Sequence, residues 1–70
     1  MPRYTVQLNN YLQKQGQLAA LHWGEEFVNK EWKLTAYLNQ ETAGVGVSAQ
    51  KGAAKELASK EALQALGQPV

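Results

Sequence analysis

The stretch LHWGEEFVNKEWKLTAYL, residues 21–38, carries the clearest pattern in the chain. Every second residue from Trp32 to Leu38 is apolar, a period of two that is typical of a strand with one buried face. A tight turn at Asn29-Lys30 would pair this strand with the residues before it, so that apolar residues meet apolar residues and opposite charges meet. The expected pairs are Phe27 with Trp32, Glu26 with Lys33, Trp23 with Ala36 and Leu21 with Leu38. The stretch therefore predicts an antiparallel hairpin.

A third strand is expected directly after this hairpin, across a second turn at Gln40-Glu41. The predicted pairs are Leu38 with Ala43, Ala36 with Val45 and Leu34 with Val47. Glu25 is the misfit, because it falls opposite Leu34 on the apolar side, and a bulge or local twist is expected there. The three strands are expected over residues 20–28, 31–39 and 42–48, and their shared apolar face must be covered.

Two predicted helices supply that cover. The first spans about residues 5–15, where Thr5, Leu8, Tyr11 and Leu12 recur on one face and Gly16 follows as a natural stop. The second spans about residues 50–66 and ends before Gly67 and Pro69. Its expected inner side consists of Ala54, Leu57, Ala58, Glu61, Ala62 and Ala65. The predicted fold class is α+β, in the order α-β-β-β-α, with a three-stranded antiparallel sheet and both helices on one face.

Length and composition restrict the function classes. The chain has 70 residues and a formal net charge of +1, which indicates one small domain with little room for a secluded catalytic pocket. Glu25 and Glu26 point to opposite faces of a strand and cannot act together, so no enzyme is expected. With no cysteine and the single histidine His22, neither a metal nor a cofactor is expected. No apolar run is long enough for a membrane span, and we expect an intracellular protein without a membrane partner.

Two segments carry a resemblance to a known family. They are LNNYLQKQG, residues 8–16, and GVGVSAQKGAAKELASKEALQAL, residues 44–66. The first is similar to the opening helix of the double-stranded RNA-binding domain. The second is similar to that family's glycine-alternating third strand and lysine-rich second helix. With the hairpin between them, the resemblance covers nearly the whole chain. Because 70 residues with short tails are typical of an excised domain, we expect this domain to be part of a longer protein.

The resemblance implies that the chain binds double-stranded RNA by shape. A-form RNA exposes its 2′-hydroxyls across a shallow minor groove, which suits contacts from side-chain amides. The first-helix contacts carried over from the family are Val6, Asn9 and Asn10, here called the amide face. The phosphate contacts carried over from the family are Gln50, Lys51 and Lys55 at the start of the second helix, where the helix dipole adds positive potential.

The chain departs from the family pattern at two places. Gly52 stands where the family has a second lysine, which removes one phosphate contact. The loop between the first two strands lacks the family's Gly-Pro-x-His element and shrinks to Asn29 and Lys30 with their neighbours. These two residues occupy the position of a groove-contacting loop, but we expect them to contribute little. With so few lysines, weak affinity for RNA is expected.

The alternative function is a protein-protein interaction or dimerisation module with the same fold and little RNA binding. It would use a free strand edge or the outer sheet face around His22, Thr35 and Tyr37. The partner would then be another protein or a domain of the parent chain. Trp23 and Trp32 share the phase of Leu34, so we interpret them as core residues rather than as base-stacking platforms.

Overall fold

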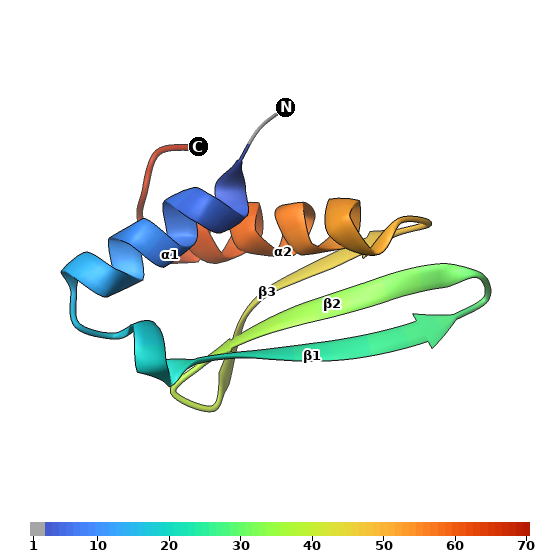
Figure 1. Cartoon of the computed structure of the whole chain (residues 1–70), viewed down its shortest axis with the longest axis horizontal. Coiled ribbons are helices and arrows are strands. Elements are labelled where there is room, and N and C mark those ends of the chain that lie inside the picture. Colours follow the sequence, from blue (N-terminus) through green and yellow to red (C-terminus); the bar gives the residue numbers. More distant parts are fainter. Residues whose placement is uncertain (1–2) are drawn as a thin grey trace.

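The computed structural model describes residues 3–70 and has the predicted α+β architecture, with two helices on one face of a three-stranded antiparallel sheet (Figure 1). The sheet order is β1-β2-β3, so β1 and β3 are the edge strands. A short 3-10 helix, which the sequence pattern did not predict, connects α1 to β1. In chain order the elements are α1 (Tyr4–Lys14), η1 (Leu18–Ala20), β1 (Leu21–Val28), β2 (Glu31–Leu38), β3 (Glu41–Ser48) and α2 (Lys51–Ala65).

The β1–β2 hairpin has the predicted register, including Phe27 opposite Trp32 and Leu21 opposite Leu38. Its two-residue turn has φ values of 53° at Asn29 and 63° at Lys30. Two consecutive positive φ values are the conformation of a hairpin turn whose twist matches the twist of the strands. The pairing continues without interruption through Glu25, so the bulge expected there is absent.

The predicted pairing of β2 with β3 is wrong. The turn lies at Asn39 and Gln40, Leu38 pairs with Glu41, and the register shifts between Ala36 and Tyr37. As a result Gly44 and Gly46, rather than the valines, lie opposite Ala36 and Leu34. The reason is α2: a Cβ on Gly46 would lie 2.0 Å from the carbonyl oxygen of Ala54, so only glycine fits beneath the helix.

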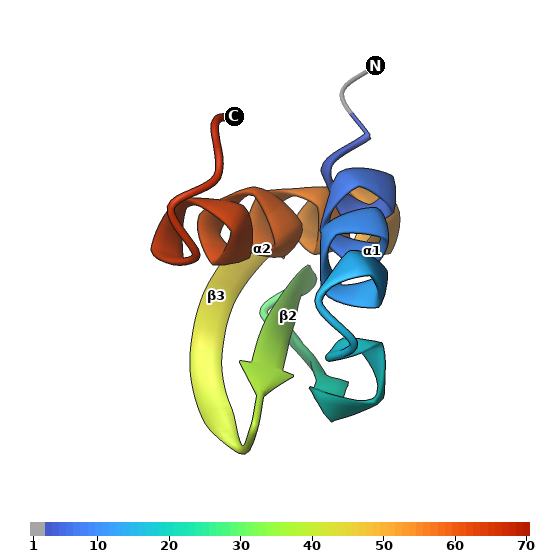
Figure 2. The same cartoon turned by 90° about the vertical axis from the view of Figure 1, so that its left-hand side faces the viewer.

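The inner side of α2 also differs from the prediction. Its buried residues are Ala54, Ala58, Ser59, Ala62 and Leu63. Leu57, Glu61 and Ala65, which were expected inside, are exposed. The inner side is rotated because α2 packs against three elements at once, the glycine-lined β3 and the neighbouring β2 below it and α1 beside it (Figure 2). Leu57 lies beside Gly46 of β3 and keeps 48% of its surface exposed.

The first helix packs through Leu8 and Leu12, which are fully buried as the spacing predicts. Its start is held by α2: the backbone N–H groups of Tyr4 and Thr5 donate to the Glu56 carboxylate at 2.6 and 3.3 Å. This contact places a negative charge at the positive end of the helix dipole. It also fixes where α1 crosses α2.

The core forms two clusters, one for each half of the sheet. Leu8 and Leu12 of α1 meet Ala36 and Leu63 in the first cluster, whereas in the second cluster Leu34 meets Ala54 and Ala58 of α2, with Trp23 and Trp32 packed against them. Trp32, which the strand pattern places in the core, is only partly buried. The β1–β2 hairpin extends beyond the start of α2, so this end of the sheet has a thinner cover (Figure 1).

Candidate nucleic-acid interface

The amide face lies on the side of α1 that points away from Leu8 and Leu12. Val6 is 50% exposed, Asn10 is exposed and Asn9 is partly buried. This arrangement agrees with the predicted division of α1 into an inner and an outer face. Two amide side chains and one apolar side chain are therefore accessible on the outside of the helix.

The start of α2 carries the cationic part of the site. Lys51 is the first helical residue, and Lys55 follows one turn later. Gln50 occupies the N-cap position and is exposed, and no side chain among residues 3–70 caps the helix there. The first amides of α2 and the two lysines, here called the lysine pair, present positive potential at one place.

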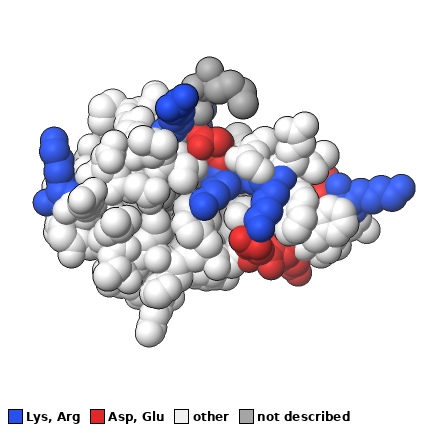
Figure 3. All heavy atoms as spheres, viewed as in Figure 1, with Lys and Arg blue, Asp and Glu red and all other residues white. Residues whose placement is uncertain are grey.

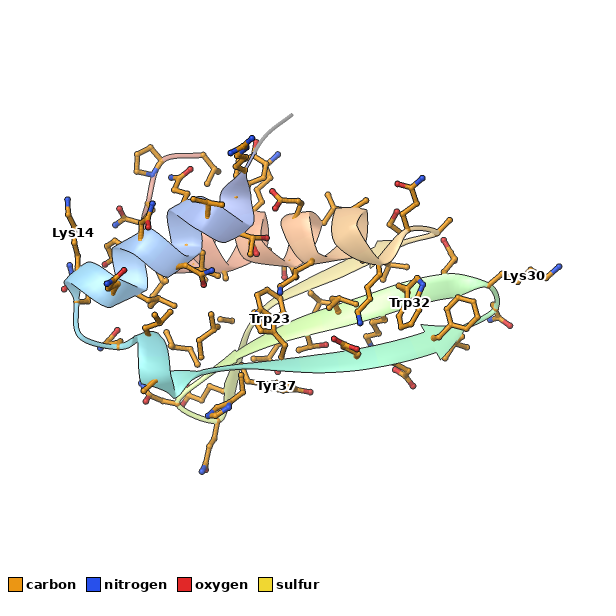
Figure 4. The ribbon with its side chains drawn as sticks, in the orientation of Figure 1. Lys14, Trp23, Lys30, Trp32 and Tyr37 are labelled. Atoms are coloured by element: carbon orange, nitrogen blue, oxygen red, sulfur yellow. The ribbon has the colours of Figure 1, made fainter. Side chains whose placement is uncertain are left out.

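Both lysines are held in place by aromatic rings of the hairpin. The Nζ atom of Lys51 lies 5.2 Å from the centre of the Trp32 ring, and that of Lys55 lies 5.1 Å from the Trp23 ring. Sequence reasoning placed the two tryptophans in the core and the lysines in solvent, and it did not anticipate these contacts. The tryptophans pack against the core on one side and support the lysine pair on the other (Figure 4).

Lys51 also forms an ion pair with the misfit residue Glu25. The distance from its Nζ to Oε1 of Glu25 is 2.8 Å, and the side chains are 48% and 46% exposed. Because β1 is an edge strand and the Glu25 side chain is 46% exposed, its carboxylate reaches solvent from the inner face opposite Leu34 without a bulge. In the sequence, this ion pair was indicated by the unexpected position of Glu25 on the apolar side of the hairpin.

The amide face and the lysine pair belong to the same side of the molecule. Lys51 and Lys55 contact residues of β1 and β2, Glu25, Trp32 and Trp23, and are directed toward the hairpin. In Figure 2, α1 and the start of β1 lie on the right and β3 lies on the left, while α2 runs across the view and its orange beginning is seen behind α1. An elongated ligand that lies along β1 could therefore contact both the amide face and the lysine pair.

The third predicted element of the site, the hairpin turn, lies apart from α1. Figure 4 shows Lys30 at one end of the long axis and Lys14, the last residue of α1, at the other. The molecule measures 36 Å along this axis. Asn29 and Lys30 are exposed, but a two-residue turn does not form a separate loop that could enter a groove.

The charge on this side is mixed rather than uniformly basic. Figure 3 shows Lys and Arg side chains spread along the length of the molecule, with acidic side chains among them. Lys60 belongs to the same basic set, because its Nζ lies 5.7 Å from the ring of Tyr4 at the start of α1. Sequence reasoning did not include Lys60, since only the packing of α1 on α2 brings it near the start of α1.

The alternative interaction surface on the outer sheet face is smaller than predicted. His22 and Tyr37 are paired and exposed, but Thr35 is buried at 9% exposure. The Tyr37 ring lies over Gly24, where an added Cβ would be 2.8 Å from its Cε2. The tyrosine thus covers the middle of the sheet, and Thr35 is not available to a partner.

Comparison of the chain with protein-family models, with curated proteins and with solved structures gave no match. Within residues 3–70, none of the helices has the length and apolar character needed to cross a membrane.

Proposed function

We propose that this chain binds double-stranded RNA by shape. The amide face of α1 contacts the minor groove, and the lysine pair with Gln50 contacts phosphates across the adjacent major groove. The observation that carries the proposal is the fixed position of the lysine pair, on the side of the molecule where α1 also lies. The resemblance of residues 8–16 and 44–66 to the double-stranded RNA-binding domain supports the same function.

The chemistry of these side chains fits an A-form duplex. Amides offer both donors and acceptors to 2′-hydroxyl groups, which distinguish RNA from DNA. Lysines attract phosphates without reading bases, so the binding would tolerate any sequence. Because Lys51 and Lys55 already rest on tryptophan rings, less side-chain entropy is lost when they meet phosphates.

The same geometry predicts low affinity. Few lysines contact the RNA, and the Asn29-Lys30 turn supplies no second groove-entering loop. Counterion release increases with the number of phosphates that are neutralised, so a small number gives weak binding and a shallow salt dependence. We expect an isolated domain to bind duplex RNA in the micromolar range or weaker.

A titration followed by fluorescence anisotropy tests the proposal. The ligands are a long perfect RNA duplex, a DNA duplex of the same sequence and one strand of the RNA, each at two salt concentrations. We expect the RNA duplex to bind best and its affinity to fall as salt rises. Equal binding of all three ligands, or no duplex binding at high micromolar protein in low salt, would contradict the proposal.

A protein-interaction module is the second candidate function. It is favoured by exposed apolar side chains at the end of the sheet, where Phe27 and Val28 of β1 and Val47 of β3 are each about half exposed. Val28 and Val47 line a shallow pocket together with charged residues of β1 and β2. Sedimentation at increasing protein concentration would detect self-association through this end, whereas the RNA proposal requires none.

A further inference from the structure

Glu25 introduces a negative charge into the candidate RNA interface. It belongs to β1, pairs with Leu34 in the sheet, and extends from the face on which the helices pack. Its carboxylate reaches the Nζ atom of Lys51 at 2.8 Å. Lys51 is half of the lysine pair, so one of the two proposed phosphate contacts already has an anionic partner in the free protein.

The ion pair does little to hold the fold together. Both side chains are nearly half exposed, and exposed pairs of this kind are screened by water and salt. The Trp32 ring provides an independent support for Lys51, at 5.2 Å from its Nζ. Removing the charge of Glu25 therefore leaves Lys51 near its present position, with its full charge available.

A phosphate that approached Lys51 would meet Glu25 at the same place. The carboxylate would compete with it for the ammonium group and repel it at short range. Both effects oppose binding, and both disappear when the side chain becomes neutral.

We infer that Glu25 limits the affinity of this domain for duplex RNA by occupying Lys51. This inference rests on the proposed function and adds a residue that lowers the affinity of the same site. A single carboxylate sets the affinity below what the lysine pair would otherwise give. It accounts for a charged residue at a position where the strand pattern calls for an apolar one.

Glu26 provides a matched control. It is the next residue in β1 and is also exposed, but it pairs with Lys33 and points to the opposite face of the sheet. Glu25→Gln and Glu26→Gln change the net charge by the same amount. Only the first removes charge next to Lys51, so the comparison separates the local effect from the effect of net charge.

The experiment measures the affinity of the wild type, Glu25→Gln and Glu26→Gln for one RNA duplex at low salt, with circular dichroism as a check on folding. We expect Glu25→Gln to bind about three- to tenfold more tightly and Glu26→Gln to stay within twofold of the wild type. In a Lys51→Gln background, Glu25→Gln should change the affinity by less than twofold, because the competing cation is gone.

The outcomes separate the inference from the proposed function. Equal strengthening by both glutamine variants, or weaker binding by Glu25→Gln, would overturn the inference and leave RNA binding intact. An undiminished effect in the Lys51→Gln background would overturn it as well, since the effect would not pass through Lys51. If no variant binds the duplex at all, the proposed function fails and the inference fails with it.

Discussion

At the scale of single residues, the glycines of β3 determine how closely α2 approaches the sheet. A Cβ on Gly46 would lie 2.0 Å from the carbonyl oxygen of Ala54 and 2.5 Å from the amide nitrogen of Ala58. Gly44 has the same relation to Ala58 and Ala62. Backbone atoms in the middle of a helix cannot move aside as the end of a flexible side chain can. The helix therefore rests directly on the strand.

We expect Gly46→Ala to lower the free energy of unfolding by at least about 1–3 kcal/mol, the usual cost of forcing extra atoms into a packed core. Gly52→Ala is the matched control, because a Cβ there meets nothing within 4 Å. It removes a poor helix former from α2 and should stabilise the fold by up to about 1 kcal/mol. Urea unfolding measures both values. A Gly46→Ala variant as stable as the wild type would show that the contact between α2 and β3 leaves room for a Cβ.

At the scale of elements, the two hairpin turns share one conformation although their sequences differ. Asn29-Lys30 and Asn39-Gln40 both have positive φ values at both turn residues. Asparagine tolerates this conformation better than most residues, but lysine and glutamine do not favour it. The second position of each turn is thus a site of small backbone strain, and glycine would relieve it.

Lys30→Gly tests the structural and the RNA-binding role of the first turn together. It should raise the free energy of unfolding by about 0.4–1 kcal/mol, because glycine suits the positive φ of the turn. It should weaken duplex RNA binding by less than threefold, because the turn is too short to reach a second groove. Gln40→Gly relieves the same strain at the other turn and serves as the reference for stability. A tenfold loss of RNA affinity in Lys30→Gly alone would place the turn in the interface.

The two hairpins also show how far sequence patterns determine the fold. The first register followed from the alternation around Trp32 and from cross-strand charges, which are local properties of residues 21–38. The second did not, because the placement of Gly44 and Gly46 is decided by α2, which follows in the chain. The candidate site was likewise only partly predictable from the sequence. The amide face followed from helical spacing, whereas the supports of the lysine pair, Trp23 and Trp32, depend on how the layers pack.

At the scale of the whole molecule, the net charge is only +1, but the charged and polar side chains are unevenly distributed. The start of α2, which carries the lysine pair, lies between α1 and the far end of the β1–β2 hairpin (Figure 1), and the molecule measures 36 Å along its longest axis. Double-stranded RNA-binding domains typically span about 16 base pairs through two minor grooves and the phosphates between them. In the proposed binding mode, this chain would use a helix for one groove and lysines for the phosphates, but it has only a two-residue turn at the far end.

The strongest test of the proposed function separates the contribution of the lysine charges from that of the amide contacts in the minor groove. Changing Lys51 and Lys55 together to Gln should weaken binding to every duplex RNA sequence about equally. It should also reduce the slope of log affinity against log salt by about two, one for each lost phosphate contact. The variant loses two cation–π contacts at exposed or partly buried sites, which cost about 0.5–1 kcal/mol each, so its fold should persist by circular dichroism.

Changing Asn9 and Asn10 together to Ala should affect RNA selectivity rather than the salt dependence of binding. Binding should weaken while the salt slope stays unchanged, and the preference for RNA over DNA should shrink, because these amides are proposed to contact 2′-hydroxyl groups. Gln15→Ala is a suitable control, since Gln15 is another exposed amide, at the C-cap of α1 and outside the amide face. If the lysine variant keeps the wild-type slope, or if the asparagine variant keeps the full preference for RNA, the assignment of that element is wrong. If both variants bind duplex RNA as the wild type does, the interface lies elsewhere, and the apolar end of the hairpin becomes the better candidate for a binding surface.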